Sequence, residues 1–409
     1  MRLSARAEVT PPNELALARQ QHIGAVTELT DSNPTRHGLM DPLVMDIVAR
    51  HLDEARRYSP DPHGWRPARE ALASRYGGSA DDYWLTASTS EAYSWLFAVL
   101  ADPGDSVAVP GPGYPLVEPL ARLSGLYTVP YRSQYLHPHG WELDLDSVRG
   151  VILPTSPVIL PSSPVILPSS PVILPQAGPL PQAVRALVAV NPNNPTGAYI
   201  AHDQAVQLGA MCAKAGLPII ADEVFFPFLL DDSSDRAAPM RLADAVGPDA
   251  VVVTLDGLSK LLAAPQLKLG WIRLSGPSKL TKPLADALDV VADTFLSVNS
   301  PVACALPELL ELADASIAQI RARCSANLRA LDGLGDGFRV RRTQGGWTAL
   351  VDVPRVADDD TLAHRLLEAG LSAHPGWFYD VPDNACLALS LLPEPTAFAE
   401  SLKRLEQAI

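Results

Sequence analysis

Three short segments of the sequence each place a polar or charged side chain directly after an apolar run. Asn194 lies in the turn NPNNPTG, Asp222 follows the run LPII, and Lys260 ends the segment DGLSK. If the apolar runs are strands of one open α/β sheet, their carboxyl ends meet at a single crevice, where such sheets bind ligands. An amide, a carboxylate and an amine in one crevice suit pyridoxal 5'-phosphate (PLP).

The elements that must position these residues alternate along the chain. From about residue 66 onward, short apolar runs alternate with segments of helical periodicity, such as Ser90–Leu100 and His202–Ala215. This alternation predicts an α/β fold with a mostly parallel sheet flanked by helices. We expect seven strands: Tyr83–Thr86, Ser106–Val109, Leu126–Val129, Ala186–Val190, Ile219–Ala221, Val251–Leu255 and Gly270–Leu274.

The pattern changes after about Gly276 and predicts a smaller α+β domain. The expected elements there are helices over Pro283–Phe295 and Val302–Leu334, a strand over Thr348–Val353 and a final helix from Pro395. We therefore expect a large cofactor-binding domain over 38–275 and a small domain over 276–409. The N-terminal segment 1–37 should join the small domain.

The spacing of the three residues carries a resemblance. Asp222 follows Asn194 by 28 residues (222 − 194), and Lys260 follows Asp222 by 38 (260 − 222). With these motifs, the chain resembles the fold-type I PLP-dependent aminotransferases of class I/II over roughly Ser32–Ser390. The resemblance implies that Lys260 forms the internal Schiff base with PLP and then moves the Cα proton. It also implies that Asp222 keeps the pyridine nitrogen protonated and that Asn194 donates to the O3' oxygen.

Other positions match cofactor contacts of the same family. Tyr114 in GPGYP matches the aromatic residue that stacks on the cofactor ring. The cofactor phosphate should contact the stretch between a strand and a helix that contains Ser88, Thr89 and Ser90. Tyr58 matches the tyrosine that reaches the phosphate of the other subunit, so the resemblance implies a homodimer.

The remaining expected contacts lie next to the lysine and near the N-terminus. Ser259 precedes the lysine and joins the expected cofactor contacts. The loop SNPTRHG, with Asn33, Arg36 and Gly38, resembles the segment that closes over the substrate. The segments Gly345–Trp347 and His374–Phe378 suggest an aromatic-walled pocket, although core packing explains them equally well.

Four positions depart from the family pattern. Lys268 stands where an arginine normally binds the phosphate, which keeps the charge but loses the bidentate geometry. Phe225 and Gly257 replace a tyrosine and a serine that often contact the cofactor. Ala388 stands where an arginine usually binds the substrate α-carboxylate. Either another cation substitutes, with Arg36 the best candidate, or the substrate is not an ordinary α-amino acid.

The resemblance implies an aminotransferase that moves an amino group between an amino acid donor and a keto acid or carbonyl acceptor. The same cofactor chemistry also serves β-elimination as in C–S lyases, cyclisation and decarboxylation, so these reactions stay open as alternatives. A non-catalytic PLP-binding protein is a third possibility. No segment has the glycine spacing of a dinucleotide-binding protein, which disfavours an NAD-dependent dehydrogenase.

The composition narrows the partners and the cellular location. The 409 residues carry a formal net charge of −14, which disfavours nucleic acid, and no apolar run approaches the roughly 20 residues of a membrane span. The four cysteines show neither a CxxC pair nor zinc-type spacing, so we expect reduced thiols and no metal site. The N-terminus lacks the apolar stretch of a secretory signal, and a cytoplasmic location is expected.

One insertion explains part of an unusual proline content. From Val151 the heptad VILPTSP or VILPSSP is repeated three and a half times, and residues 151–181 hold 9 of the 39 prolines. Prolines this closely spaced exclude a helix or a central strand and favour an extended arm. The arm is either a partner-binding or dimer-forming segment or a surface insertion without chemistry of its own.

Overall fold

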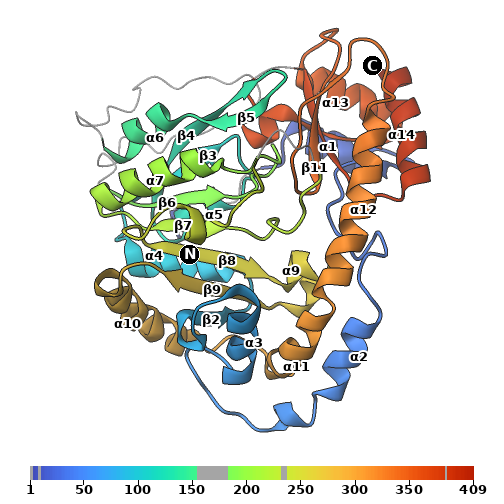
Figure 1. The fold of residues 1–409 in the computed structure, drawn as a ribbon. Helices are drawn as coiled ribbons and strands as arrows, with labels where there is room; N and C mark the ends of the chain where they lie inside the picture. The colour runs from blue at the N-terminus through green and yellow to red at the C-terminus, as the bar shows by residue number, and fades with distance from the viewer. Residues whose placement is uncertain (1–2, 8–10, 154–182, 232–236, 383–384) are drawn as a thin grey trace.

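The computed structural model describes residues 3–7, 11–153, 183–231, 237–382 and 385–409. The expected extended arm lies outside these ranges from Pro154 to Pro181. The described part of the chain forms a large unit built on one central sheet and a smaller unit at the upper right of Figure 1.

The main sheet confirms the expected mostly parallel α/β architecture. In the described ranges its strand order is β2-β9-β8-β7-β6-β3-β4-β5. Neighbouring strands from β8 to β4 pair in parallel, whereas β9 is antiparallel to β2 and β8. The strands are β2 (Tyr83–Thr86), β3 (Ser106–Gly111), β4 (Tyr127–Leu136), β5 (Gly140–Leu143), β6 (Val184–Val190), β7 (Ile219–Asp222), β8 (Val252–Gly257) and β9 (Gly270–Ser275).

The sheet has one strand more than the seven that the sequence predicts. Strand β4 continues to Leu136, and the chain then turns back into β5, which pairs antiparallel with it. Its four residues, GWEL, include Gly and Glu, which are depleted in strands, and form no continuous apolar run of the kind that marks β2 and β7. Its Trp141 is nevertheless buried. The hairpin therefore adds an edge strand that periodicity could not reveal.

Helices cover both faces of the sheet because side chains along each strand alternate between the faces. On β6, Ala186 and Val188 pack with α4, α5 and α10, while Leu187 and Ala189 pack with α6, α7 and α8 on the opposite face. The helices of the large unit that precede residue 262 are α2 (Leu43–Arg50), α3 (Arg66–Tyr76), α4 (Thr89–Leu100), α5 (Val117–Leu123), α6 (Leu145–Ile152), α7 (His202–Ala215), α8 (Leu242–Ala245) and α9 (Leu258–Leu261).

Helices α10 (Ser278–Phe295) and α11 (Ser300–Glu311) fall within the range expected for the small domain but pack on the large unit. The apolar face of α10, with Leu284 and Leu288, joins the core beside the sheet. Helix α11 packs against α2 and α3. The single long helix expected over Val302–Leu334 is therefore divided, because α11 ends at Glu311 and α12 begins at Ala313.

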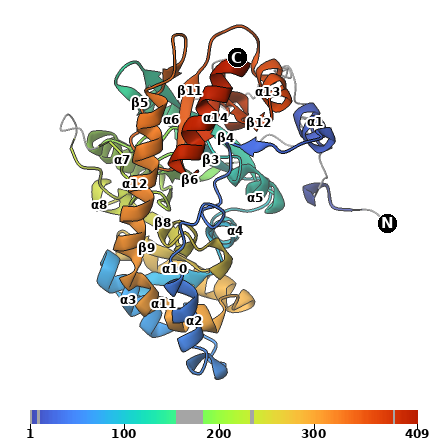
Figure 2. The same cartoon turned by 90° about the vertical axis from the view of Figure 1, so that its right-hand side faces the viewer.

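The small unit is built on a four-stranded antiparallel sheet with the order β10-β11-β14-β13. Its core contains Leu366 of α13 and Phe398 of α14, and α12 runs down the right side of Figure 1 toward α11. Near the N-terminus, β1 pairs in parallel with β12, as Figure 2 shows. The bounds are β1 (Thr27–Glu28), β10 (Arg339–Val340), β11 (Thr348–Asp352), β12 (Leu371–Ser372), β13 (His374–Pro375), β14 (Cys386–Ser390), α1 (Glu14–Gln21), α12 (Ala313–Leu331), α13 (Asp359–Glu368) and α14 (Pro395–Ala408).

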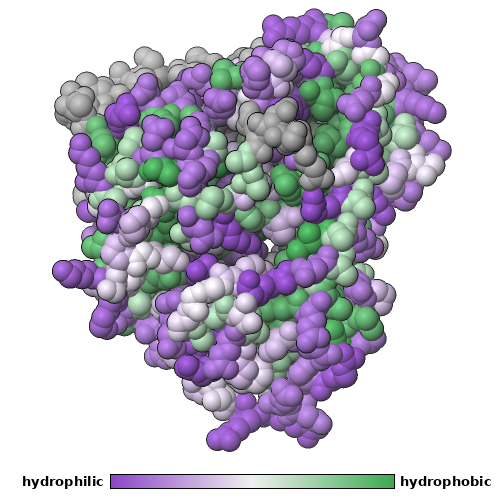
Figure 3. All heavy atoms as spheres, in the orientation of Figure 1, coloured by the Kyte–Doolittle hydropathy of each residue, from purple (hydrophilic) through white to green (hydrophobic). Residues whose placement is uncertain are grey.

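The surface in Figure 3 is mostly hydrophilic at its outer edges. Apolar surface shows mainly toward the middle and right of this face, over the region where Figure 1 places α9 and α11. Among the helices of the described ranges, none has both the length and the apolar character needed to span a bilayer.

Candidate active site

Three adjacent parallel strands bring Asn194, Asp222 and Lys260 to one edge of the sheet. Asn194 follows β6, Asp222 ends β7, and Lys260 lies on α9 directly after β8. The backbone N–H of Asn191 donates to the carbonyl oxygen of Asp222 over 2.9 Å, which connects the turn after β6 to the end of β7. The arrangement matches the expectation from strand order, because the carboxyl ends of parallel neighbours lie side by side.

The side chain of Asp222 is buried and accepts two hydrogen bonds. Its Oδ2 accepts from the hydroxyl of Tyr93 at 3.0 Å, and its Oδ1 accepts from the N–H of Val224 at 3.4 Å. Burial raises the pKa of Asp222 to about 6, because a carboxylate loses hydration in the interior, while these bonds and the charge of Lys260 act in the opposite direction.

The amine of Lys260 lies between two aromatic rings. Its Nζ is 5.3 Å from the ring centroid of Phe225 and 5.1 Å from that of Trp347. Burial lowers the pKa of Lys260, and the carboxylate of Asp222 opposes this shift. Within the described part of the chain, Lys260 forms no ion pair. A larger neutral fraction of this amine is therefore present near neutral pH than for an exposed lysine.

The side-chain amide of Asn194 has a buried oxygen whose hydrogen-bonding capacity the described chain leaves unused. Its Oδ1 is shielded from solvent and has no hydrogen-bond partner among the described residues. A buried unpaired polar atom is costly unless a ligand or water completes it. The N–H donors of this amide, the amine of Lys260 and the carboxylate of Asp222 fit the phenolate oxygen, the aldehyde and the protonated ring nitrogen of PLP, respectively.

The residues expected to hold the phosphate lie at the start of α4. Ser88 caps this twelve-residue helix, with its Oγ accepting from the N–H of Glu91 at 3.2 Å, and Thr89 and Ser90 begin the first turn. The start of β9 lies against this turn, because a Cβ atom on Gly270 would be 3.4 Å from the carbonyl carbon of Ser88. Helix N-termini favour anions.

Lys268 precedes Gly270 by two residues, so it lies at the same edge of the sheet. Its side chain is exposed, and its backbone has a left-handed φ of +49°. Ser259 is half-buried on α9, next to the lysine. The structure thus brings the candidate phosphate contacts and the lysine segment to neighbouring ends of β2, β8 and β9.

A segment of the small unit closes one side of this site. The N–H of Gly345 donates to the carbonyl oxygen of Gly197 at 2.9 Å, and a Cβ atom on Gly345 would lie 2.7 Å from the ring of Tyr199. Only glycine permits this close approach, which brings Trp347 beside Lys260. Trp347 is also buried in the core of the small unit. The Gly345–Trp347 segment therefore contributes an aromatic ring beside Lys260 and also packs in the core.

The N-terminal loop with Asn33, Arg36 and Gly38 is attached to the small unit. The hydroxyl of Ser390 donates to the carbonyl oxygen of Asp31 at 2.8 Å. Asn33 caps the turn by accepting from the N–H of Thr35 at 3.1 Å. The side chain of Arg36 is 70% exposed and pairs loosely with Asp31 at 3.4 Å. The next residue after Gly38, Leu39, is buried in the core that also contains Trp347.

Position 388 carries no charge in a packed environment. Ala388 is 2% exposed and lies opposite Leu350 and His374 in the sheet of the small unit. Tyr379 and Trp141 pack in the same cluster. Burial lowers the pKa of His374, so this imidazole is mostly neutral near neutral pH. Strand β14 therefore presents no cation where the family pattern has an arginine.

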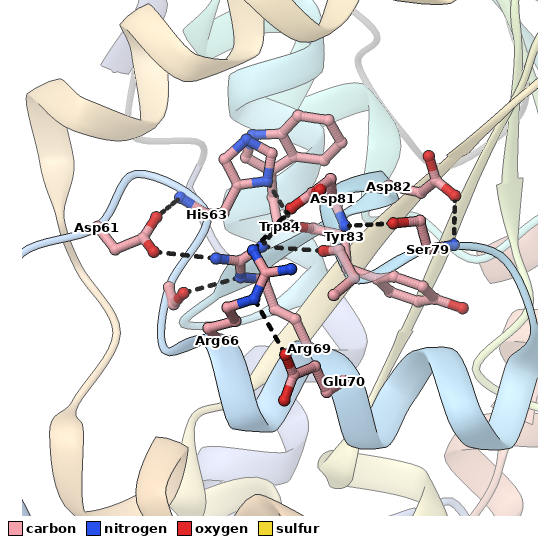
Figure 4. A network of polar contacts seen from close by, with 12 residues as sticks. Asp61, His63, Arg66, Arg69, Glu70, Ser79, Asp81, Asp82, Tyr83 and Trp84 are labelled. Carbon is pink, nitrogen blue, oxygen red and sulfur yellow. Dashed lines mark hydrogen bonds and ion pairs between the residues drawn. The ribbon is translucent and has the colours of Figure 1, made fainter.

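Tyr114 and Tyr58 are more exposed than the other candidate residues. Tyr114 is 48% exposed, and its ring lies 6.4 Å from that of Tyr379. Tyr58 is 73% exposed in the loop before α3. Figure 4 shows how Arg69 holds this loop: its guanidinium donates to Asp61 at 2.9 Å and to the carbonyl oxygen of Gly64 at 2.9 Å. The loop is anchored while the Tyr58 ring faces outward.

The sequence did not single out Tyr93, which contacts Asp222. A tyrosine on an apolar face of α4 gives no signal of its own, because ordinary core packing explains it. The sequence also missed a buried ionic cluster behind Asp222, in which Arg241 pairs with Glu223 at 3.0 Å and with Asp256 at 3.2 Å. Arg241 is 18 residues from Glu223 and 15 from Asp256, so only the fold brings the three together.

The chain is similar in sequence to known aminotransferases. The chain is 28% identical over 294 residues to the glutamate-pyruvate aminotransferase AlaA of Escherichia coli, covering 70% of this chain and 63% of that protein. It is 27% identical over 303 residues to an alanine aminotransferase of Mycobacterium tuberculosis, covering 72% and 62%. The chain thus matches less than two thirds of the length of these relatives.

The fold is also that of solved aminotransferase structures. An alanine aminotransferase from Pyrococcus furiosus superimposes with a TM-score of 0.81 at 21% identity, covering 99% of each chain. Residues 31–396 match the family described as aminotransferase class I and II. This range contains the three convergent side chains and most of both structural units. The chain belongs to the aminotransferase class I and II family.

Proposed function

We propose that this protein is a PLP-dependent aminotransferase that moves an amino group between an amino acid donor and a keto acid or carbonyl acceptor. Members of its family use PLP. The observation that best supports the proposal is the buried amine of Lys260 beside the buried carboxylate of Asp222, at the strand ends where α/β sheets bind ligands. The printed activities of the relatives agree with an amino transfer.

When bound, PLP supplies an electron sink for the substrate Cα. In the proposal, Lys260 would hold the cofactor through Nζ, and its free amine would take the proton from the substrate Cα. The lowered pKa of Lys260 favours its role as a general base, because only the neutral amine can accept a proton. Asp222 pairs with the ring nitrogen, and Asn194 donates to the phenolate oxygen.

The other contacts complete the binding site. Ser88, Thr89, Ser90 and Lys268 hold the phosphate at the start of α4, and Tyr114 covers the ring. Phe225 and Trp347 exclude water from the lysine, because both rings lie against its amine. Arg36 takes the substrate carboxylate that Ala388 cannot bind.

We further propose a cytoplasmic homodimer. Tyr58 supports the dimer, since its exposed ring lies on an anchored loop and is open to a partner subunit. All four cysteines are buried, and the free thiols of Cys212, Cys304 and Cys324 agree with a reducing compartment. Size-exclusion chromatography with light scattering tests the dimer, and a monomer at every concentration contradicts it.

The central experiment compares purified wild type with Lys260→Ala after addition of PLP. The wild type should develop a visible absorbance that borohydride treatment removes. The reduced cofactor should then be recovered covalently attached to the peptide that contains Lys260. Lys260→Ala should show neither. Supplying glutamate, and separately alanine, should then convert the wild-type cofactor into pyridoxamine phosphate, which pyruvate reverses. Release of keto acid and ammonia without pyridoxamine phosphate would identify a lyase instead.

A further inference from the structure

The hydroxyl of Tyr93 forms the shortest hydrogen bond to the carboxylate of Asp222. The two residues are 129 positions apart, and the 3.0 Å bond runs from a helix that covers the sheet to the end of a central strand. Tyr93 is fully buried, and its ring lies 5.8 Å from that of Phe97 on the same helix. The position of the hydroxyl is therefore fixed by the packing around the Tyr93 ring.

The surroundings of Asp222 offer this carboxylate little other support. Four charged or titratable groups lie near it: Lys260, Glu223, Asp256 and Tyr93. The guanidinium of Arg241 stands behind them but pairs with Glu223 and Asp256. Among the described residues, the second carboxylate oxygen of Asp222 accepts only the long bond from Val224. Tyr93 is thus the main hydrogen-bond donor to this acid in the described structure.

A donor to a carboxylate stabilises its ionised form and fixes its orientation. Burial disfavours the ionised form of Asp222, and the hydrogen bond from the Tyr93 hydroxyl lowers the free-energy cost of ionising this carboxyl. The pKa of Tyr93 itself is raised well above its ordinary value by burial and by the neighbouring carboxylate. The phenol therefore keeps its proton over the whole working range of pH and can donate throughout.

We propose that Tyr93 is a positioning residue for Asp222: its hydroxyl orients the carboxylate and keeps it ionised, so that it can pair with the ring nitrogen of PLP. This inference rests on the function proposed above. It assigns to α4 two tasks, the phosphate contact at its first turn and the support of the acid four residues further on.

The first test uses the PLP-free protein, so it does not depend on catalysis. The pKa of the Asp222 carboxyl is measured by infrared difference titration, with D222N to assign the band. Loss of a hydrogen bond to a charged group should raise this pKa by about one to two units in Y93F. The matched control is Y131F. Tyr131 is equally buried, but its hydroxyl donates to the carbonyl oxygen of Val188 at 2.8 Å, so the Asp222 pKa should stay unchanged.

The second test measures PLP binding at two pH values. With a higher Asp222 pKa, Y93F has less ionised acid at about pH 7, and its Kd for PLP should rise about two- to tenfold there. At about pH 9 the acid is mostly ionised in both proteins, and the difference should largely disappear. A purely structural defect would weaken binding equally at both values and would overturn the proposal, as would an unchanged Asp222 pKa in Y93F.

If Y93F does not fold, the double variant Y93F/D222N decides. It should fold, because removing the charge removes the need for the donor. A double variant that also fails to fold contradicts the coupling. The two proposals fail separately: a wild type without the lysine-dependent absorbance refutes the proposed function, whereas the titration of the PLP-free protein decides whether Tyr93 acts on Asp222.

Discussion

Gly257 of β8 lies directly opposite Gly270 of β9, and a Cβ atom on Gly257 would come within 2.9 Å of the Gly270 Cα. This approach gives a physical reason for the glycine at 257, where the family often has a serine. The pair also determines how close Lys260 and Lys268 lie to each other. Lys260 follows Gly257 by three residues, and Lys268 precedes Gly270 by two.

Substitution of Gly257 should therefore separate the two strands at the site. We expect Gly257→Ala to lower the free energy of unfolding by about 1–3 kcal/mol, because backbone atoms cannot move aside cheaply. PLP binding should also weaken. Gly150→Ala is the control: a Cβ there meets nothing within 4 Å, and on α6 it should leave stability equal or raise it by about 0.5–1 kcal/mol. Urea unfolding measures the free energy of unfolding of both variants. A Gly257→Ala variant as stable as the wild type would contradict the steric argument.

The burial of Asp222 should make the PLP-free protein less stable as the pH rises. The pKa of Asp222 is raised from 3.8 to about 6 in the folded state, so the folded protein binds more protons than the unfolded chain between these values. Stability is lost over about pH 4 to 6 in the wild type. D222N has no titratable carboxyl at this position. Its free energy of unfolding should therefore exceed that of the wild type by an amount that grows from near zero at about pH 4 to about 3 kcal/mol above pH 6.

Urea unfolding of both PLP-free proteins across this pH range measures the difference. Asp256, whose pKa burial also raises to about 6, is present in both proteins, so the part of its titration that does not depend on the charge of Asp222 cancels in the comparison. A constant difference between D222N and wild type at every pH would show that the carboxyl titrates normally.

Arg36 should matter for the amino donor and not for the chemical step. We expect Arg36→Ala to raise KM for the donor about tenfold or more, since a charge-assisted hydrogen bond to a carboxylate is lost, with kcat nearly unchanged. The control is Arg56→Ala, which removes another exposed arginine paired with an acid, Asp53, at 2.8 Å. Steady-state kinetics decide the matter, and an unchanged KM in Arg36→Ala removes this residue from the substrate site.

Lys268 should contribute to PLP affinity through its charge. We expect Lys268→Gln to raise the Kd for PLP about tenfold, with a smaller effect at high salt, because the ammonium is exposed and therefore screened. Lys268→Arg should bind at least as tightly as wild type, since guanidinium can hold a phosphate with two hydrogen bonds. Lys279→Gln, also exposed but on α10, should have no effect. Equal affinity in Lys268→Gln and wild type would exclude the phosphate contact.

The sequence alone predicted most of the large unit and the convergence of Asn194, Asp222 and Lys260. Each of these residues lies at or shortly after the carboxyl end of a buried strand, and strands β6, β7 and β8 pair side by side, so local patterns already imply where the side chains meet. The four-residue strand β5 and the packing of α10 on the large unit were not predictable in this way. Strand β5 lacks the apolar run that reveals the equally short β2 and β7, and an amphipathic helix does not specify which apolar surface it covers.

Tertiary structure decided the environment of the three residues. The raised pKa of Asp222 and the lowered pKa of Lys260 come from burial, to which segments distant in sequence contribute. The hydroxyl of Tyr93 and the ring of Trp347 reach them from a covering helix and from the small unit. Residue type and spacing determined which groups are present. Only the packing of the two units determined how strongly each group is desolvated and which donor or ring it contacts, because these depend on long-range contacts that no local pattern encodes.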